Sequence, residues 1–281
     1  MATDSQLASG GNSGAVKLWK LNEPRSVETL FDEKENVTAL DFSRDGKWVA
    51  WGTEKGMVRI CNLRDRKITR LEPHRGSVVG IQFDQSSQEV FSGGQDRRVI
   101  VTRLDDLEKN HRVIEFENPI RGMAVHSMTN QLAVVTGKSL VVKNAESGEL
   151  IRHWERKPIP FEVLRSPIAF SPDGKSVAFT GRHMEVHVNA IESGKTTAVL
   201  ADHVDGIQDL SYSPSGRRLL TTARDGKIKF WDTQRRTVVY TLRDLNGYAN
   251  TLSVSPDERR FAVGTFGGSI LIWDTKQSDR K

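Results

Sequence analysis

The side chains able to do chemistry occur in small groups, and the spacing within each group decides what it could do. His183 and His187 stand four residues apart in HMEVH, a spacing that would suit zinc on a helix. They lie instead at the edge of a short β-type run with no third ligand nearby, whereas zinc needs three or four converging N, S or O ligands. We therefore interpret them as surface or turn histidines and predict no metal and no cofactor.

Two glycine-rich stretches and an acidic pair complete the candidates for catalysis. Residues 92–94 (SGG) and 266–269 (FGGS) lack the following helix and the Lys-Ser/Thr pair of a phosphate loop. Asp105 and Asp106 lie in polar sequence, without an apolar pocket to separate their pKa values. No GxSxG nucleophile elbow occurs. The sequence predicts a protein that is not an enzyme; a catalytic site inside a central cavity remains the alternative.

The elements that would position these residues are short strands joined by tight turns. Residues 203–233 contain three alternating apolar runs, at 207–212, 218–222 and 227–231, separated by SPSG and ARDG. Proline and glycine at these places preset the backbone angles of tight turns. With a leading run at 195–200, the stretch predicts one four-stranded antiparallel sheet.

This stretch resembles a repeat of the WD-repeat β-propeller family. The resemblance rests on His203 before the first run, Asp225 in the second turn, and Trp231 followed by aspartate. It implies a buried structural set within one sheet, in which a loop histidine, a strand threonine, a turn aspartate and the tryptophan are hydrogen-bonded. Here that set would be His203, Thr221 or Thr222, Asp225 and Trp231. A structural role is favoured over a catalytic one for this histidine and aspartate.

Similar units recur along the whole chain. The positions equivalent to Trp231 succeed one another at intervals of 42, 41, 41, 46, 42 and 42 residues, at Trp19, Cys61, Thr102, Lys143, Asn189, Trp231 and Trp273. A period of ~40–45 residues with four strands per unit is the propeller signature. We predict an all-β, seven-bladed propeller of four-stranded antiparallel sheets, one domain over residues 1–281. Its approximate units are 1–21 (partial), 22–63, 64–104, 105–145, 146–190, 191–232 and 233–274, with a polar tail at 275–281.

The first unit begins in mid-repeat. Its recognisable runs are at 7–9 and 15–21, so the first blade is expected to be incomplete and to contain strands b and c only. In most WD-repeat propellers the other chain end supplies the missing strands, but residues 275–281 are short and polar. Either the sequence is truncated, or a strand donor, from another chain or a second copy, completes the blade.

Composition narrows the class of protein. The net charge of +5, from 41 basic and 36 acidic residues, is interspersed and shows no basic block of the kind that binds nucleic acid. No apolar run approaches the ~18 residues of a membrane helix, and no signal-peptide core is present. The single cysteine, Cys61, fits a reducing compartment and a buried thiol. We predict a cytoplasmic, intracellular soluble protein that binds neither nucleic acid nor membrane.

The expected contact residues surround the mouth of a central channel. The resemblance implies that partners bind the face carrying the loops before each first strand and the turns between second and third strands. Arginine and aromatic residues are enriched in interaction hot spots, and arginine binds carboxylate or phosphate bidentately. We predict a scaffold binding a protein or peptide there, in its sharper form an acidic or phosphorylated one; solvated surface arginines are the alternative. The candidates by register are Arg75, Gln95, Arg121, Arg182, Asp205, Arg224, Tyr248 and Phe266.

One insertion interrupts the period. Residues 156–167, RKPIPFEVLRSP, contain three prolines and predict a rigid exposed loop. Such a loop is where a specific contact could be added, and a tolerated surface insertion is the alternative.

Overall fold

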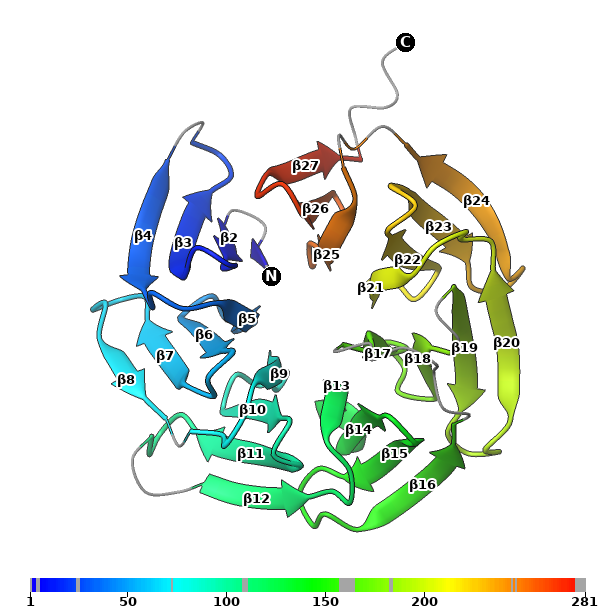
Figure 1. Ribbon diagram of the computed structural model, residues 1–281, viewed down its shortest axis with the longest axis horizontal. Helices are drawn as coiled ribbons and strands as arrows, with labels where there is room; N and C mark the ends of the chain where they lie inside the picture. Colours follow the sequence, from blue (N-terminus) through cyan, green and yellow to red (C-terminus); the bar gives the residue numbers. More distant parts are fainter. Residues whose placement is uncertain are drawn as a thin grey trace.

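Short antiparallel strands account for the architecture, as the alternating apolar runs predict. The computed structural model describes residues 2–3, 6–23, 26–71, 73–107, 111–156, 165–181, 184–243, 245 and 247–275. Its strands form seven separate sheets arranged in a ring (Figure 1). The predicted all-β, seven-bladed propeller is confirmed.

Each sheet is one blade, and its strands follow in chain order from the centre outward. The blades are blade 1, with β1 (Ala2–Thr3), β2 (Gln6–Ser9), β3 (Ala15–Lys20) and β4 (Val27–Asp32); blade 2, with β5 (Val37–Phe42), β6 (Trp48–Thr53), β7 (Val58–Asn62) and β8 (Ile68–Arg70); blade 3, with β9 (Val78–Phe83), β10 (Glu89–Gly94), β11 (Arg98–Arg103) and β12 (His111–Glu115); blade 4, with β13 (Ile120–His126), β14 (Gln131–Thr136), β15 (Ser139–Asn144) and β16 (Leu150–Glu155); blade 5, with β17 (Ile168–Phe170), β18 (Ser176–Thr180), β19 (Glu185–Ala190) and β20 (Thr196–Ala201); blade 6, with β21 (Ile207–Tyr212), β22 (Arg218–Ala223), β23 (Ile228–Asp232) and β24 (Thr237–Leu242); and blade 7, with β25 (Ala249–Val254), β26 (Arg260–Thr265) and β27 (Ile270–Asp274). The helical element of the described residues is a single 3₁₀ turn, η1 (Ser127–Thr129), and none of their helices is long and apolar enough to cross a bilayer.

The sequence repeat and the blade are offset by one strand. The run at 195–200, expected to join the sheet of residues 207–231, is β20 and pairs with β19 of blade 5; that expectation was wrong. A tight turn decides the pairing, because Gly194 adopts φ 69° and the Ala190 N–H bonds to the Lys195 carbonyl at 2.9 Å. The fourth strand of blade 6 is instead β24, which follows its third strand.

The same offset changes the strand content of blade 1. Its sheet is not limited to strands b and c: β4 pairs with β3 as the outer strand, and the two-residue β1 pairs with β2. The incompleteness of blade 1 lies in that very short inner strand. Blade 7 has three strands among the described residues, and β27 is the outermost of them.

Apolar layers hold neighbouring blades together. Six buried clusters form, one at each junction from blades 1–2 to blades 6–7. Trp51, Val16 and Cys61 in the first of them are almost fully buried, and burial raises the pKa of the Cys61 thiol. Among the described residues no such cluster joins blade 7 to blade 1, where Ile272 remains 43% exposed. The ring is therefore packed tightly at six of its seven junctions.

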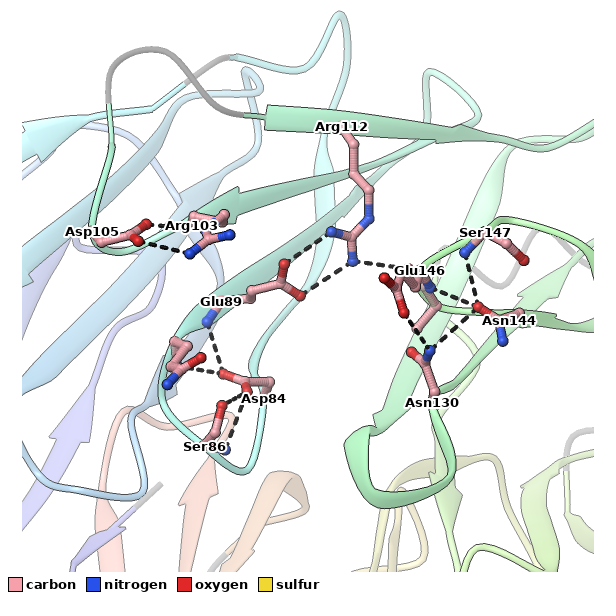
Figure 2. A network of polar contacts seen from close by, with 12 residues as sticks. Asp84, Ser86, Glu89, Arg103, Asp105, Arg112, Asn130, Asn144, Glu146 and Ser147 are labelled. Carbon is pink, nitrogen blue, oxygen red and sulfur yellow. Dashed lines mark hydrogen bonds and ion pairs between the residues drawn. The ribbon is translucent and has the colours of Figure 1, made fainter.

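Polar side chains also join consecutive blades. Near the centre, Asp41 accepts the Phe83 N–H at 2.8 Å and Gln82 accepts the Val125 N–H at 2.8 Å, each bond reaching from one inner strand to the next. At the perimeter, Arg112 bonds to Glu89 in its own blade, as Figure 2 shows. The same guanidinium donates to the Ala145 carbonyl of blade 4, and both bonds are 2.9 Å long. These bonds fix the blades relative to one another, which gives the channel a defined rim.

Candidate interaction site at the channel mouth

A chain of four side chains ties the mouth of blade 6 to its sheet. His203 Nδ1 lies 2.8 Å from an Asp225 oxygen, and His203 Nε2 lies 2.8 Å from Thr221 Oγ1. The indole N–H of Trp231 donates to the same Thr221 oxygen at 2.9 Å. Asp225 also accepts the backbone N–H of Val204 at 3.2 Å. The loop before β21 is thus bonded to the turn between β22 and β23.

The hydrogen bonds assign the protonation of this histidine. An acceptor at Asp225 requires N–H at His203 Nδ1, and the Thr221 hydroxyl then donates to Nε2 while accepting from Trp231. Burial lowers the pKa of His203, with the Asp225 carboxylate opposing this effect. A neutral, buried imidazole in a satisfied network suits a structural role.

Blade 3 contains a shorter version of the same network. His74 lies 2.9 Å from Asp96 and 3.0 Å from Ser92 Oγ. Thr102 occupies the position of the tryptophan. Burial again lowers the pKa of the histidine. These networks hold the mouth loops of blades 3 and 6 in place.

A recurring backbone hydrogen bond builds the rim itself. In four blades the first residue after the second strand donates its N–H, at 3.0 Å, to the loop before the first strand. The donors and acceptors are Glu54 and Asn36, Gln95 and Ser77, Arg224 and Gly206, and Phe266 and Tyr248. Each donor's side chain therefore starts from an equivalent point on the mouth.

Inner-strand bulges add a second ring of side chains. The pairing of the first and second strands slips by one residue near the mouth in blades 2, 3, 4, 6 and 7. A bulge leaves one residue unpaired and re-aims its side chain. The residues so placed are Thr38, Val79, Arg121, Gln208 and Asn250.

The central channel has a volume of about 1880 Å³. Gln95, Asp205, Arg224 and Phe266 of the candidate set line it. It extends into the space between blades 7 and 1, since Trp19 and Ile272 also line it. Half of the candidate residues are therefore brought to one shared surface.

The other candidates do not line the channel in the described part of the chain. The Tyr248 ring stacks on the Phe266 ring, with ring centroids 4.9 Å apart and an angle of 26° between the ring planes. Arg75 is exposed outside the channel lining, and its N–H bonds to Asp96 at 3.0 Å. Arg121 packs over Gly137 of its own blade, where an added Cβ would lie 3.1 Å from the guanidinium. Arg182 falls outside the described residues.

The aromatic pair stands beside an arginine of the neighbouring blade. Phe266 is 65% exposed although it stacks on Tyr248. The turn carrying Arg224 lies against the loop before β25, since an added Cβ on Gly226 would be 3.7 Å from the Gly247 carbonyl. We call Arg224, Tyr248 and Phe266 the aromatic rim; it presents an apolar ring next to a cation.

The other groups considered for chemistry are engaged or dispersed. His187 contacts the Glu185 carboxylate at 3.2 Å, and His183 falls outside the described residues. Asp105 pairs with Arg103 at 2.7 Å on the surface. Within the described ranges no three His, Cys, Asp or Glu side chains converge as metal ligands.

Several rim residues escaped the sequence reasoning. Glu54 could have been found, because it holds the same register as Gln95 and Arg224; its carboxylate accepts from Asn36 Nδ2 at 2.8 Å. The bulged residues have no signal in composition, because the slip arises from strand pairing. Arg165, which lines the channel, lies in the insertion at 156–167, and only the broken period pointed to that segment.

The repeated four-stranded sheets and the two histidine networks define a WD-type β-propeller. A family model described as "Vps42 beta-propeller" matches residues 7–155, just over half of the chain. The "WD domain, G-beta repeat" model matches residues 194–232 and 237–274, the first of which contains the network of blade 6. The chain belongs to the WD-repeat β-propeller family.

Curated relatives align with parts of the chain. It is similar to target of rapamycin complex subunit wat1 of Schizosaccharomyces pombe, 29% identical over 135 residues, which are 47% of this chain and 43% of that protein. It is similar to SPA1-RELATED 3 of Arabidopsis thaliana, 28% identical over 57% of this chain and 19% of that protein. It is also similar to the human F-box-like/WD repeat-containing protein TBL1Y, 26% identical over 34% of this chain and 21% of that protein. The chain spans less than half the length of each.

Proposed function

We propose that the protein is a non-catalytic scaffold that binds a protein or peptide at the channel mouth. The observation that carries the proposal is the aromatic rim, in which Phe266 remains 65% exposed while it stacks on Tyr248. Aromatic and arginine side chains are the residue types that dominate binding energy at protein interfaces. A ring held by stacking also loses little conformational freedom on binding.

The surrounding structure supports this proposal. The hydrogen bonds between blades and the histidine networks hold the rim loops in one arrangement, so a partner would meet a preformed surface. The Schizosaccharomyces pombe relative is named as a complex subunit, which agrees with a role in protein assembly. An enzyme with its site in the channel is the weaker candidate, because the described lining residues include no histidine or cysteine, and their two carboxylates, Glu54 and Asp205, belong to different blades.

Affinity capture from an extract, quantified by mass spectrometry, tests the proposal. Wild-type protein is compared with Phe266→Ser and with Met128→Ser. Met128 is a matched control, because its side chain is 77% exposed on η1, on the face of the propeller opposite to the channel mouth. We expect a defined set of proteins to be lost with Phe266→Ser and kept with Met128→Ser. Equal recovery by all three proteins would reject the aromatic rim as the contact surface.

A second candidate function follows from the open edge of blade 7. β27 pairs with β26 on one side and has no described strand on the other, whereas every other blade carries a fourth strand. Its sequence, ILIWD, has no lysine or proline of the kind that protects an edge from pairing. We propose that β27 accepts an extended strand from another chain.

Light scattering over a range of protein concentrations tests the simplest donor, a second copy. We expect Ile272→Lys, on the open edge strand, to shift an associating chain toward monomer. Val239→Lys provides the control, because Val239 is similarly exposed (44% against 43%) but lies on β24, the fourth strand of its blade. A chain that is monomeric at every concentration would exclude self-association and leave a different chain as donor.

A further inference from the structure

Three arginines gather where blades 4 and 5 meet the channel mouth. Arg121 occupies the bulge of β13, and Arg156 follows the end of β16. Arg165 precedes β17 and lines the channel. The Ser166 N–H donates to the Arg121 carbonyl at 2.9 Å, which places Arg165 beside the start of β13. We call Arg121, Arg156 and Arg165 the basic sector.

Arg156 is held by bonds across the two blades. Its guanidinium donates to the Thr136 carbonyl of blade 4 at 3.0 Å and to the Thr180 carbonyl of blade 5 at 2.6 Å. It also lies 5.5 Å from the centre of the Phe179 ring. Thr180 and Gly181, to which it is bonded, line the channel. A half-buried cation is therefore fixed against the channel wall.

None of the three arginines of this sector forms an ion pair with a carboxylate of the described residues. Burial and the nearby charge of Arg121 lower the pKa of Arg156 to about 10. Arg165 feels the charge of Asp209, but forms no ion pair with it. The described arginines that do pair with carboxylates are Arg59, Arg66, Arg103, Arg112, Arg218, Arg259 and Arg260.

We propose that the basic sector binds a phosphate monoester carried by a protein partner. Arg121 over Gly137 and Arg156 at the neighbouring Thr136 carbonyl hold like charges close together, and an oxyanion between them removes the cost of their repulsion. A phosphate group offers close to two negative charges and three acceptor oxygens, which match several guanidinium donors. The inference rests on the proposed scaffold function and assigns the phosphorylated residue of its partner to blades 4 and 5.

The shape of the site favours a peptide over a membrane surface. The exposed side chain of Arg165 lines the channel, and the half-buried Arg156 contacts the channel wall, so both border the channel. A single phosphorylated side chain can enter such a mouth, whereas the headgroups of a flat bilayer would have to leave their plane. The aromatic rim on blades 6 and 7 borders the same channel and would take an apolar residue of the same peptide.

An array of synthetic peptides tests the inference, with each sequence carrying serine, aspartate or phosphoserine. Dissociation constants of the best binders are then measured by fluorescence anisotropy. The variants are Arg121→Gln and Arg165→Gln. Arg156 is left intact, because its loss would leave carbonyls of two blades unbonded. The control is Arg217→Gln, an exposed arginine after the turn between β21 and β22, on the face of the propeller opposite to the channel mouth.

We expect binding of phosphoserine peptides, at least tenfold weaker binding of the serine and aspartate forms, and a tenfold or greater loss with either variant. Arg217→Gln should bind as the wild type does, and unchanged melting temperatures confirm folding. Absence of peptide binding, equal binding of the three forms, or an equal loss with Arg217→Gln would overturn the inference. So would binding only to vesicles containing a phosphorylated inositol lipid.

Failure of this inference can be separated from failure of the scaffold function. If Phe266→Ser abolishes partner capture while Arg121→Gln and Arg165→Gln preserve it, the scaffold stands and the phosphate site is rejected. If none of these variants changes capture, both proposals fail.

Discussion

The Asp41 carboxylate of blade 2 accepts the backbone N–H of Phe83 in blade 3 at 2.8 Å, although Asp41 is almost completely buried. Burial raises its pKa from 3.8 to about 6. The bond joins two inner strands, so this buried acid lies at a junction that shapes the channel. Its protonation should therefore be visible in the stability of the whole ring.

The Asp41→Asn variant should lose one component of the pH dependence of stability. An acid whose pKa is raised by folding holds its proton more tightly in the native state, so its stabilising contribution is present below pH 3.8 and is lost as the pH rises through 6. Asparagine keeps an acceptor for Phe83 and carries no charge. From pH 4 to pH 7 the stability of the variant relative to wild type should improve by on the order of 2 kcal/mol. Urea unfolding at both pH values measures this, and parallel profiles of the two proteins would contradict it.

Neighbouring threonines on β22 should respond in opposite ways to the same substitution. Thr221→Val removes the acceptor of Trp231 and the partner of His203, leaving buried polar groups unsatisfied at a cost of about 2–4 kcal/mol. Thr222 is equally buried, but its hydroxyl has no hydrogen-bond partner. Thr222→Val should therefore be neutral or stabilising by up to about 1 kcal/mol. Denaturant unfolding compares them, and equal losses would show that the network of blade 6 adds nothing.

A methyl group at Gly94 should disrupt the network of blade 3. An added Cβ would lie 2.6 Å from Asp96 Oδ1 and even closer to His74 Nδ1. His74 is fully enclosed and cannot move aside, so Gly94→Ala should destabilise the protein by about 2–4 kcal/mol. Gly11→Ala is the control, because nothing lies within 4 Å of its added Cβ. A thermal melt of both variants checks this, and a Gly94→Ala protein as stable as the control would show that the loop can shift.

The sequence was sufficient for the fold because its signals are local and repeated. Turn sequences such as SPSG recur at the propeller period, and Trp231 with its aspartate identifies the unit. The period alone cannot say which neighbour a strand joins. The run at 195–200 fits the repeat whether it is grouped with the strands before it or with those after it. The hairpin closed at Gly194 pairs it with β19, so it belongs to blade 5.

The candidate site was harder to predict because it depends on where side chains converge. Arg224 and Phe266 could be placed by register, since equivalent backbone bonds hold them. Arg121 has the same residue type as Arg224, yet a bulge directs it over Gly137 and toward Arg156. The spacing of residues in the sequence does not predict the bulge that redirects Arg121. The basic sector could therefore be recognised only from the positions of blades 4 and 5 in the structure.

Amide hydrogen exchange should reveal the open edge of blade 7. In β23 the backbone is paired with β22 on one side and β24 on the other, whereas the one partner of β27 among the described strands is β26. The amides of β27 that face away from β26 should exchange at least about tenfold faster than their counterparts in β23, because water reaches them without any opening of the sheet. Mass spectrometry of short peptic peptides covering each strand measures the difference. If the amides of β27 are as protected as those of β23, a strand already covers this edge in solution. Loss of that protection on dilution would identify the strand as one from a second chain.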